Sequence, residues 1–259
     1  MGERFEQRRD AEVPASPEEV WAAIATGPGI DSWFMGHSEV DPGGGGAGGT
    51  VRTVFGQYAP ELDIIAWDPP RRFGYRGAEA PDGRFIAYEF LIEGRGGGST
   101  VLRAVTSGFI PGDDWADEYE AMTAGGDGYF RTLVEYLTYF RGRYAVPVTA
   151  FGPPGTDWKR DRSLLCAALG VPDACVPGDT VRFTPAETGP AKTGLVDGVL
   201  FQASPSILAV RTPEAFYRFL HGFGHPMVAA HQLFGGNLDP DPAARAWESW
   251  LATILGPRP

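Results

Sequence analysis

The chain has 259 residues and carries 33 acidic against 22 basic side chains, which gives a formal net charge of −11 and an isoelectric point near 4.8. Nucleic acids and anionic membrane surfaces would repel such a protein, so we expect neither as a partner. Hydrophobic residues make up 43% of the chain, but no run reaches the ~18 apolar residues of a membrane span and the N-terminus lacks a signal-peptide core, so we expect a cytoplasmic globular protein.

The first predicted elements are a strand over residues 4–13 and a helix over about 16–26. Ser16 is a suitable N-cap for this helix, Pro17 suits its first position, and Glu19 can reach back to complete a capping box. A second short helix over 28–34 ends in the aromatic pair Trp33-Phe34.

Five further strands are predicted after the glycine tract 43–49, over residues 50–56, 61–67, 71–77, 84–93 and 100–109. In the fourth of these, Ile86, Tyr88, Phe90 and Ile92 share one face, which predicts a sheet with one buried side. The glycine tract lacks the lysine and the following Ser or Thr of a phosphate-binding loop, and it leads into a strand. We interpret it as a flexible loop.

A long closing helix is predicted to open at Gly128, after the break at 125–128. Its apolar residues recur at helical spacing and form one stripe: Phe130, Leu133, Val134, Leu137 and Phe140. The acidic run 113–120 before the break is interpreted as a separate, water-facing helical turn.

Several motifs carry a family resemblance in their order and spacing. They are the helix start at 15–21, the pair Trp33-Phe34, the turn at 68–73, and the helix that opens at Gly128-Tyr129, with Tyr129 where the family usually has Trp. Residues 1–145 thereby resemble a START-like, helix-grip domain of the SRPBCC superfamily, in the branch named for the activator of the heat-shock-protein-90 ATPase. The resemblance implies an α+β fold in which a curved antiparallel sheet wraps around the long C-terminal helix and leaves a hydrophobic cavity.

The second half is expected to be a smaller α+β domain over 157–259, joined by a linker over 146–156. Residues 180–183 echo 50–53 and residues 217–219 echo 88–90, which suggests a truncated, degenerate repeat of the first domain. Its opening helix would cover 158–169, and its closing helix would have Asp241 as cap, but we find no convincing first strand. The alternative is that these few similarities arose by chance.

The aromatic residues of the first domain exceed what a small core requires. If the resemblance holds, the ligand would lie between the sheet and the closing helix, with the Trp33-Phe34 pair near one mouth. The predicted cavity residues are Trp33, Phe34, Trp67, Tyr75, Tyr88, Phe90, Phe109, Trp115 and Tyr129.

No catalytic constellation stands out. Four side chains could act as an acid or base if they faced the cavity, although a solvated outer face is the plainer interpretation: His37, Glu61, Asp63 and Glu89.

Two other groups of side chains have plain structural interpretations. The histidines His221, His225 and His231 have the best metal-like spacing but match no defensible ligand motif, so we expect no metal and no cofactor. Cys166 and Cys175 are interpreted as buried free thiols, with a disulfide as the alternative.

Three functions compete on this evidence. The leading hypothesis is a module that binds a small hydrophobic or amphipathic molecule without catalysis. The second is a cyclase-, aromatase- or hydrolase-like enzyme that uses the same cavity, in which positioning alone would lower the barrier. The third is a chaperone co-factor or protein-interaction module, which the family name suggests, although the residues do not point to a particular protein partner.

Overall fold

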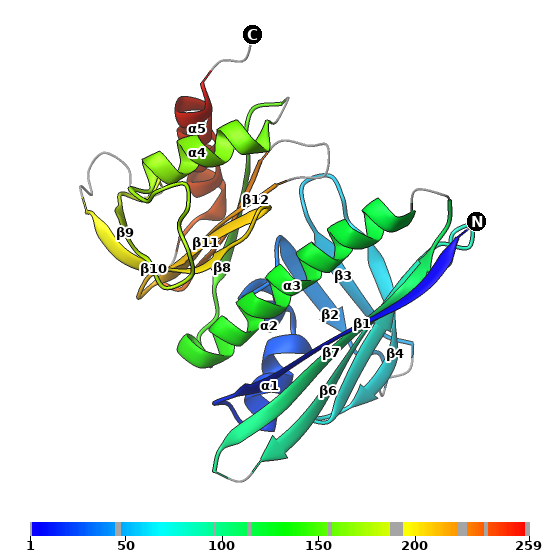
Figure 1. Cartoon of the computed structure of the whole chain (residues 1–259). Coiled ribbons are helices and arrows are strands. Elements are labelled where there is room, and N and C mark those ends of the chain that lie inside the picture. Colours follow the sequence, from blue (N-terminus) through cyan, green and yellow to red (C-terminus); the bar gives the residue numbers. More distant parts are fainter. Residues whose placement is uncertain are drawn as a thin grey trace. The chain divides into compact units, whose positions relative to one another are not determined.

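The computed structural model describes residues 2–44, 48–95, 97–112, 115–154, 157–186, 194–221, 227–235 and 238–256 (Figure 1). These residues form two compact units, Met1–Tyr144 and Ala145–Pro259, which are described one at a time. Within the described ranges, no helix combines the length and the apolar character needed to cross a lipid bilayer.

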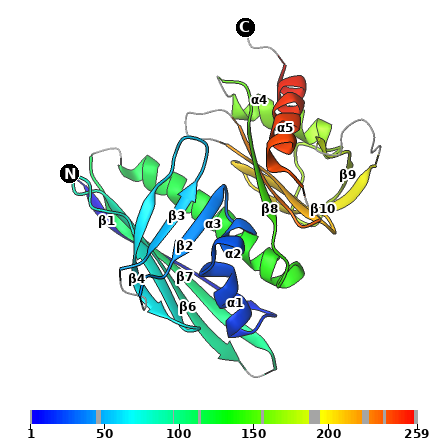
Figure 2. The same cartoon turned by 180° about the vertical axis from the view of Figure 1, so that it is seen from behind.

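The first unit is a seven-stranded antiparallel sheet with three helices, so the predicted α+β fold is confirmed. The strands follow the order β1-β7-β6-β5-β4-β3-β2, and α3 runs across one face of the sheet in both views (Figures 1 and 2). The strands are β1 Glu3–Val13, β2 His37–Asp41, β3 Thr50–Val54, β4 Glu61–Asp68, β5 Arg72–Arg76, β6 Phe85–Arg95 and β7 Ser99–Ile110. The helices are α1 Pro17–Ile24, α2 Gly27–Asp31 and α3 Trp115–Tyr139.

The start of α1 follows the predicted capping chemistry. The Ser16 side chain accepts a hydrogen bond from the backbone N–H of Glu19 at 3.2 Å, and the Glu19 carboxylate accepts one from the backbone N–H of Ser16 at 2.8 Å. Trp33 is buried just after α2, and its indole N–H donates to the backbone carbonyl of Ala23 at 3.0 Å. This bond ties the end of α2 to α1 and fixes the position of the aromatic pair.

Helix α3 is longer than the sequence predicted, because it continues through the glycines at 125, 126 and 128 without a break. Strand β1 holds this segment in place. The Arg9 side chain donates to Asp127 Oδ1 at 2.6 Å and to the backbone carbonyl of Thr123 at 3.1 Å, and Gln7 donates to the Thr123 hydroxyl at 2.6 Å. These bonds offset the low helix propensity of the glycines, each of which costs about 1 kcal/mol relative to alanine.

The second unit has a six-stranded antiparallel sheet in the order β8-β13-β12-β11-β10-β9, and the two helices α4 and α5 (Figure 1). The strands are β8 Val146–Phe151, β9 Thr180–Phe183, β10 Val196–Ala203, β11 Ile207–Arg211, β12 Ala215–Leu220 and β13 Val228–Leu233, and the helices are α4 Trp158–Ala168 and α5 Pro240–Leu255.

Three expectations for this half are wrong: the extent of the linker, the lack of a first strand and the cap of the closing helix. Residues 146–151 of the expected linker form the first strand, β8, which we did not find in the sequence. It pairs with β13 as β1 pairs with β7, and its short stretch Val146-Pro147-Val148 carried too little alternation to be seen. The cap of α5 is Asp239 and not Asp241, because the Asp239 side chain accepts from the backbone N–H of Asp241 at 3.1 Å.

The two sheets share strand order and register, which supports the predicted repeat. Phe219 pairs with Leu208 on one side and Ala229 on the other, as Phe90 pairs with Phe73 and Ala104. The register shift between Ile64 and Ala66 in β4 also recurs between Leu200 and Gln202 in β10. The second sheet ends at β9 and has no counterpart of β2 among the described strands.

The two neighbouring helix glycines Gly125 and Gly126 allow a matched test of the contact between β1 and α3. A Cβ at Gly125 would meet nothing within 4 Å, whereas a Cβ at Gly126 would lie 2.6 Å from Nη2 of Arg9. We expect Gly125→Ala to raise the free energy of unfolding by about 0.5–1 kcal/mol, and Gly126→Ala to bring no gain, because it displaces the Arg9 guanidinium. Urea unfolding of both variants measures this difference, and equal gains would contradict the described contact.

Candidate functional site

Three rows of inward-facing side chains cross the first sheet on the side of α3. The middle row contains four polar side chains and is called the tyrosine row: Gln7, Thr106, Tyr88 and Tyr75, followed by Ile64. These residues are direct cross-strand partners, so their side chains lie side by side. The Tyr75 and Tyr88 rings pack with centroids 5.3 Å apart.

The row on the α1 side is an apolar floor. Phe90 and Phe73 are cross-strand partners, and Phe73 in turn pairs with Trp67. Trp33 packs on Phe90 with ring centroids 6.3 Å apart, and Trp21 of α1 packs on Trp67 at 5.0 Å. Phe73 and Phe90 are buried. This end of the first unit is therefore closely packed.

The row on the other side alternates glycines with larger side chains. Gly108 lies between Phe5 and Ile86, and the backbone N–H of Gly77 bonds to the carbonyl of Ile86. A Cβ built on Gly108 would lie 2.8 Å from the Phe5 ring, so this ring covers Gly108. A Cβ built on Gly77 would have no heavy atom nearer than 3.8 Å, so Gly77 is the more open of the two glycine positions.

The tyrosine row keeps accessible surface although it lies deep in the unit. Tyr75, Tyr88, Thr106 and Tyr129 are only half-buried. Burial nevertheless raises the pKa of Tyr75 above its ordinary value, and raises that of Tyr88 to about 12, with smaller contributions from the neighbouring Tyr58 and Tyr129 phenols. A side chain that is desolvated yet still accessible faces a recess rather than the open surface. We infer that the tyrosine row lines such a recess.

Seven of the nine predicted cavity residues belong to one chain of ring contacts. Phe34 packs on Trp33 at 5.6 Å and on Tyr129 of α3 at 4.4 Å, which links the floor to the helix. Tyr75 lies 6.4 Å from Phe90 by ring centroids. The members are Trp33, Phe34, Trp67, Tyr75, Tyr88, Phe90 and Tyr129, and of these Trp67 lies within the packed floor.

The other two predicted residues lie elsewhere. Phe109 follows the inward-facing Gly108 and pairs with Phe85, so strand alternation places it on the outward face of the sheet. Trp115 begins α3 and packs on Tyr119, which packs on Phe5, in a separate cluster at that end of the helix. Sequence reasoning also missed Thr106 and Gln7, which become visible only once the register of β1, β6 and β7 is known.

The four acid–base candidates do not belong to the tyrosine row. Glu61, Asp63 and Glu89 occupy outward positions of their strands, and Glu89 forms an ion pair with Arg72 at 2.5 Å. His37 is 64% exposed, and its Nδ1 lies 2.7 Å from a carboxylate oxygen of Asp31. Burial raises the pKa of Asp31, while bonds from His37 and from the Ser38 backbone oppose that shift.

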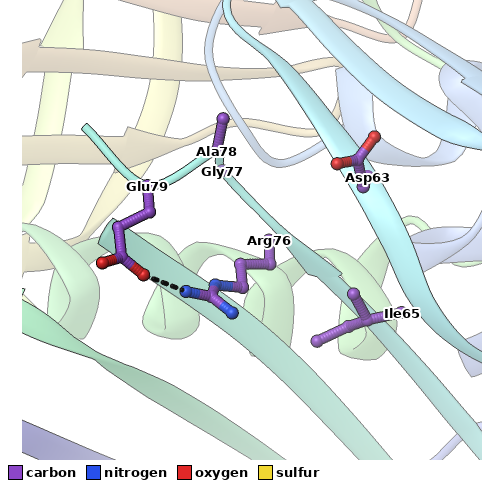
Figure 3. Close-up of a pocket in the computed structure, with 6 residues that line it drawn as sticks. All are labelled: Asp63, Ile65, Arg76, Gly77, Ala78 and Glu79. Atoms are coloured by element: carbon purple, nitrogen blue, oxygen red, sulfur yellow. Dashed lines mark hydrogen bonds and ion pairs between the residues drawn. The ribbon is translucent and has the colours of Figure 1, made fainter. Parts of the chain in front are cut away.

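A second concavity lies on the outward face of the first sheet (Figure 3). It has a volume of about 330 Å³ and is lined by Asp63, Ile65, Arg76, Gly77, Ala78 and Glu79. Arg76 donates to Glu79 at 3.2 Å, and its guanidinium lies 4.2 Å above the Phe85 ring centroid. The arginine is thus engaged by its own neighbours, and the concavity is separated from the tyrosine row by the thickness of the sheet.

The corresponding space in the second unit is filled. His231 occupies the position in β13 that Thr106 occupies in β7, because it lies two residues after Ala229 as Thr106 lies two residues after Ala104. The His231 ring packs on Trp247 of α5 with ring centroids 4.2 Å apart. Both side chains have no exposed surface. Tyr217, the counterpart of Tyr88, is also buried and lies 5.6 Å from Trp247. The large His231 side chain thus stands where the register of the first unit places Thr106.

The histidines do not come together as a metal site in the described part of the chain. His221 is exposed and stacks on Trp158, whereas the buried His231 accepts a hydrogen bond at Nδ1 from the backbone N–H of Arg218 at 3.1 Å. His225 lies outside the described residues. Among those described, no group of three or more His, Cys, Asp or Glu side chains is placed to hold a metal ion.

Comparison with known proteins identifies one family. A family model described as polyketide cyclase / dehydrase and lipid transport matches residues 4–137. This match confirms the resemblance to START-like proteins. No curated protein is significantly similar to the chain.

Solved structures with similar folds share little sequence with this chain. Protein MLL2253 from Mesorhizobium loti is 21% identical over 51% of this chain and 96% of its own, with a TM-score of 0.42. The Aha1 dimer from Colwellia psychrerythraea is 20% identical over 53% and 99%, with a TM-score of 0.41. The di-domain ARO/CYC BexL from the BE-7585A biosynthetic pathway is 12% identical over 98% and 100%, with a TM-score of 0.47.

The buried His231 predicts an acid-sensitive second unit. Burial, helped by the charge of Arg218, holds the pKa of His231 well below its ordinary value of 6.5, so the folded chain keeps it neutral while the unfolded chain takes up a proton below about pH 6.5. Its contribution to stability is therefore complete above that pH and is lost as the pH falls, by about 1.4 kcal/mol per pH unit.

Urea unfolding of the parent and of His231→Gln between pH 7.5 and 5.5 measures this contribution. We expect the parent to lose more stability than the variant over this range, and the exposed-site control His221→Gln to behave as the parent. The same pH dependence in the parent and His231→Gln would contradict the assignment.

Proposed function

Because the chain belongs to the polyketide cyclase / dehydrase and lipid transport family, we propose that its first unit binds a small hydrophobic or amphipathic molecule in the recess beside the tyrosine row. The observation that carries the proposal is the partly exposed yet desolvated pair Tyr75 and Tyr88, set beside an apolar floor. Binding sites for small molecules typically combine apolar walls with a few polar groups in this way.

The chemistry of the row defines the class of ligand. The phenols of Tyr75 and Tyr88 stay protonated at neutral pH, since their pKa values are raised, and each can donate or accept a hydrogen bond. Arg9, a cation in the neighbouring row, is bonded to Asp127 and Gln7. A molecule with an uncharged, flat apolar body and one or more hydroxyl or carbonyl oxygens fits these groups best.

Catalysis in the same recess is the second candidate, and the family description favours it. Because raised pKa values keep Tyr75 and Tyr88 protonated at neutral pH, neither is available as a base and both are weak acids, but each can donate a hydrogen bond to a carbonyl oxygen. His37, Glu61, Asp63 and Glu89, which would supply a stronger acid or base, do not belong to the tyrosine row. An enzyme of this design would act chiefly by holding a reactive molecule in one folded conformation.

Two adjacent positions of β7 provide a matched test of the recess. Thr106 faces α3 and Ser107 faces outward, and both are half-buried. We expect Thr106→Phe to fill the recess and weaken the binding of 1-naphthol about tenfold or more, which corresponds to about 1.4 kcal/mol, whereas Ser107→Phe should leave affinity unchanged. Fluorescence titration measures both, with thermal melting as the check on folding. Equal affinities in the two variants would contradict the proposed site.

The Tyr88 hydroxyl can be tested with a matched pair of probes. Tyr88→Phe removes a hydrogen-bonding group and keeps the ring, so we expect it to weaken 1-naphthol about threefold to tenfold and to leave naphthalene unaffected. A competition assay with both probes gives the two affinities. Equal losses of affinity for the two probes would show that Tyr88 contributes packing and no hydrogen bond.

A further inference from the structure

The two cysteines of the chain meet in the second unit. Cys166 lies on α4 and Cys175 lies in the loop that follows this helix; both are free thiols, with 0% and 5% of their surface exposed. The Arg162 side chain lies one turn before Cys166 on α4. Its Nη1 is 3.8 Å from the Cys166 sulfur, and its Nη2 is 3.7 Å from the Cys175 sulfur. One planar guanidinium therefore holds both sulfurs at its edge.

The backbone between the two thiols is already folded back on the helix. The N–H of Val171 bonds to the carbonyl of Cys166 at 2.9 Å, and the N–H of Cys175 bonds to the carbonyl of Pro172 at 3.0 Å. Asp173 fastens the loop further, since its carboxylate accepts from Ser163 at 2.9 Å and its carbonyl accepts from Arg162 at 2.6 Å. These bonds hold the loop that carries Cys175 against the end of α4.

The two thiols are shielded from solvent, but the neighbouring residues of the loop are exposed. Burial, with the adjacent Cys175 thiol adding to it, raises the pKa of Cys166 to about 11, which keeps the Cys166 thiol protonated in the reduced protein. The three residues that precede Cys175 in the loop, Pro172, Asp173 and Ala174, are all exposed. A small local opening of this loop would admit an oxidant, and the Arg162 cation would then stabilise a thiolate as it forms.

We propose that Cys166 and Cys175 are a reversible disulfide site, which closes when the protein meets a small-molecule disulfide such as oxidised glutathione. One cysteine thiolate attacks a sulfur of the oxidant and releases one glutathione thiolate, leaving a mixed disulfide. The second cysteine thiolate attacks the protein sulfur of that mixed disulfide and releases the second glutathione. Two electrons pass to the oxidant, and the two cysteine protons end on the two glutathione thiolates.

The bond would connect α4 with the loop before β9. That loop is already fastened to β10, because the N–H of Gly178 donates to the carbonyl of Leu200 and the N–H of Leu200 donates to the carbonyl of Asp179. Oxidation would thus join one helix to the sheet of the second unit through a short covalent loop. Since the unfolded chain loses conformational freedom when the loop is closed, the oxidised protein should be the more stable form.

Incubation of the full chain in glutathione buffers of increasing oxidised fraction tests the site. We expect non-reducing peptide mapping to find one cross-link between the Cys166 and Cys175 peptides, reversed by dithiothreitol. We expect the melting temperature of the second unit to rise by roughly 5 °C or more on oxidation. Cys166→Ser and Cys175→Ser, each with one thiol, should show neither the cross-link nor the rise.

The parent protein itself provides the decisive control, so the test does not depend on the folding of the variants. The same chain in concentrated urea should form the bond in the same oxidising buffer, which establishes that the oxidant is competent. Two free thiols in the folded chain under those conditions would overturn the proposal, and so would a cross-link that forms only between two molecules.

Discussion

The fold of each unit depends on the layer of side chains that lies between its sheet and its closing helix, at the level of Thr106 in the first unit and His231 in the second. Both units use the same strand order and the same register around this layer. Where the second unit has His231 against Trp247, the register of the first unit places Thr106. His231 and Trp247 have no exposed surface, whereas Tyr75 and Tyr88 are partly exposed. The two units therefore differ in the side chains of this layer although they share a strand order.

The helix glycines have a structural cost that β1 offsets. The bonds from Arg9 and Gln7 hold the N-terminal half of α3 on the sheet, together with the contact of Tyr119 with Phe5. The same arrangement keeps Arg9 engaged with Asp127, which leaves the uncharged phenols as the polar groups that face the recess.

Local features of the fold could be predicted from the sequence, whereas the register between distant strands could not. The capping box at Ser16, the alternation of Ile86, Tyr88, Phe90 and Ile92, and the echo of 88–90 in 217–219 predicted a helix, a buried face and a repeat. Strands β2 and β8 escaped detection because edge strands of five and six residues carry little periodic signal. Phe109 was wrongly assigned to the cavity because the short apolar pair Phe109-Ile110 at the end of β7 does not reveal which side chain faces the helix. The α3 helix was shortened because glycine propensity gives no sign of a distant arginine that holds the turn.

Binding of a small organic molecule between the tyrosine row and α3 can be observed in a crystal of the full chain soaked with 1-naphthol. We expect electron density for the naphthalene ring beside Tyr75 and Tyr88, with its hydroxyl within hydrogen-bond distance of a tyrosine oxygen. We expect no such density beside His231. Density confined to the outer concavity of Figure 3, or ordered side chains filling the space beside Tyr88, would contradict these expectations.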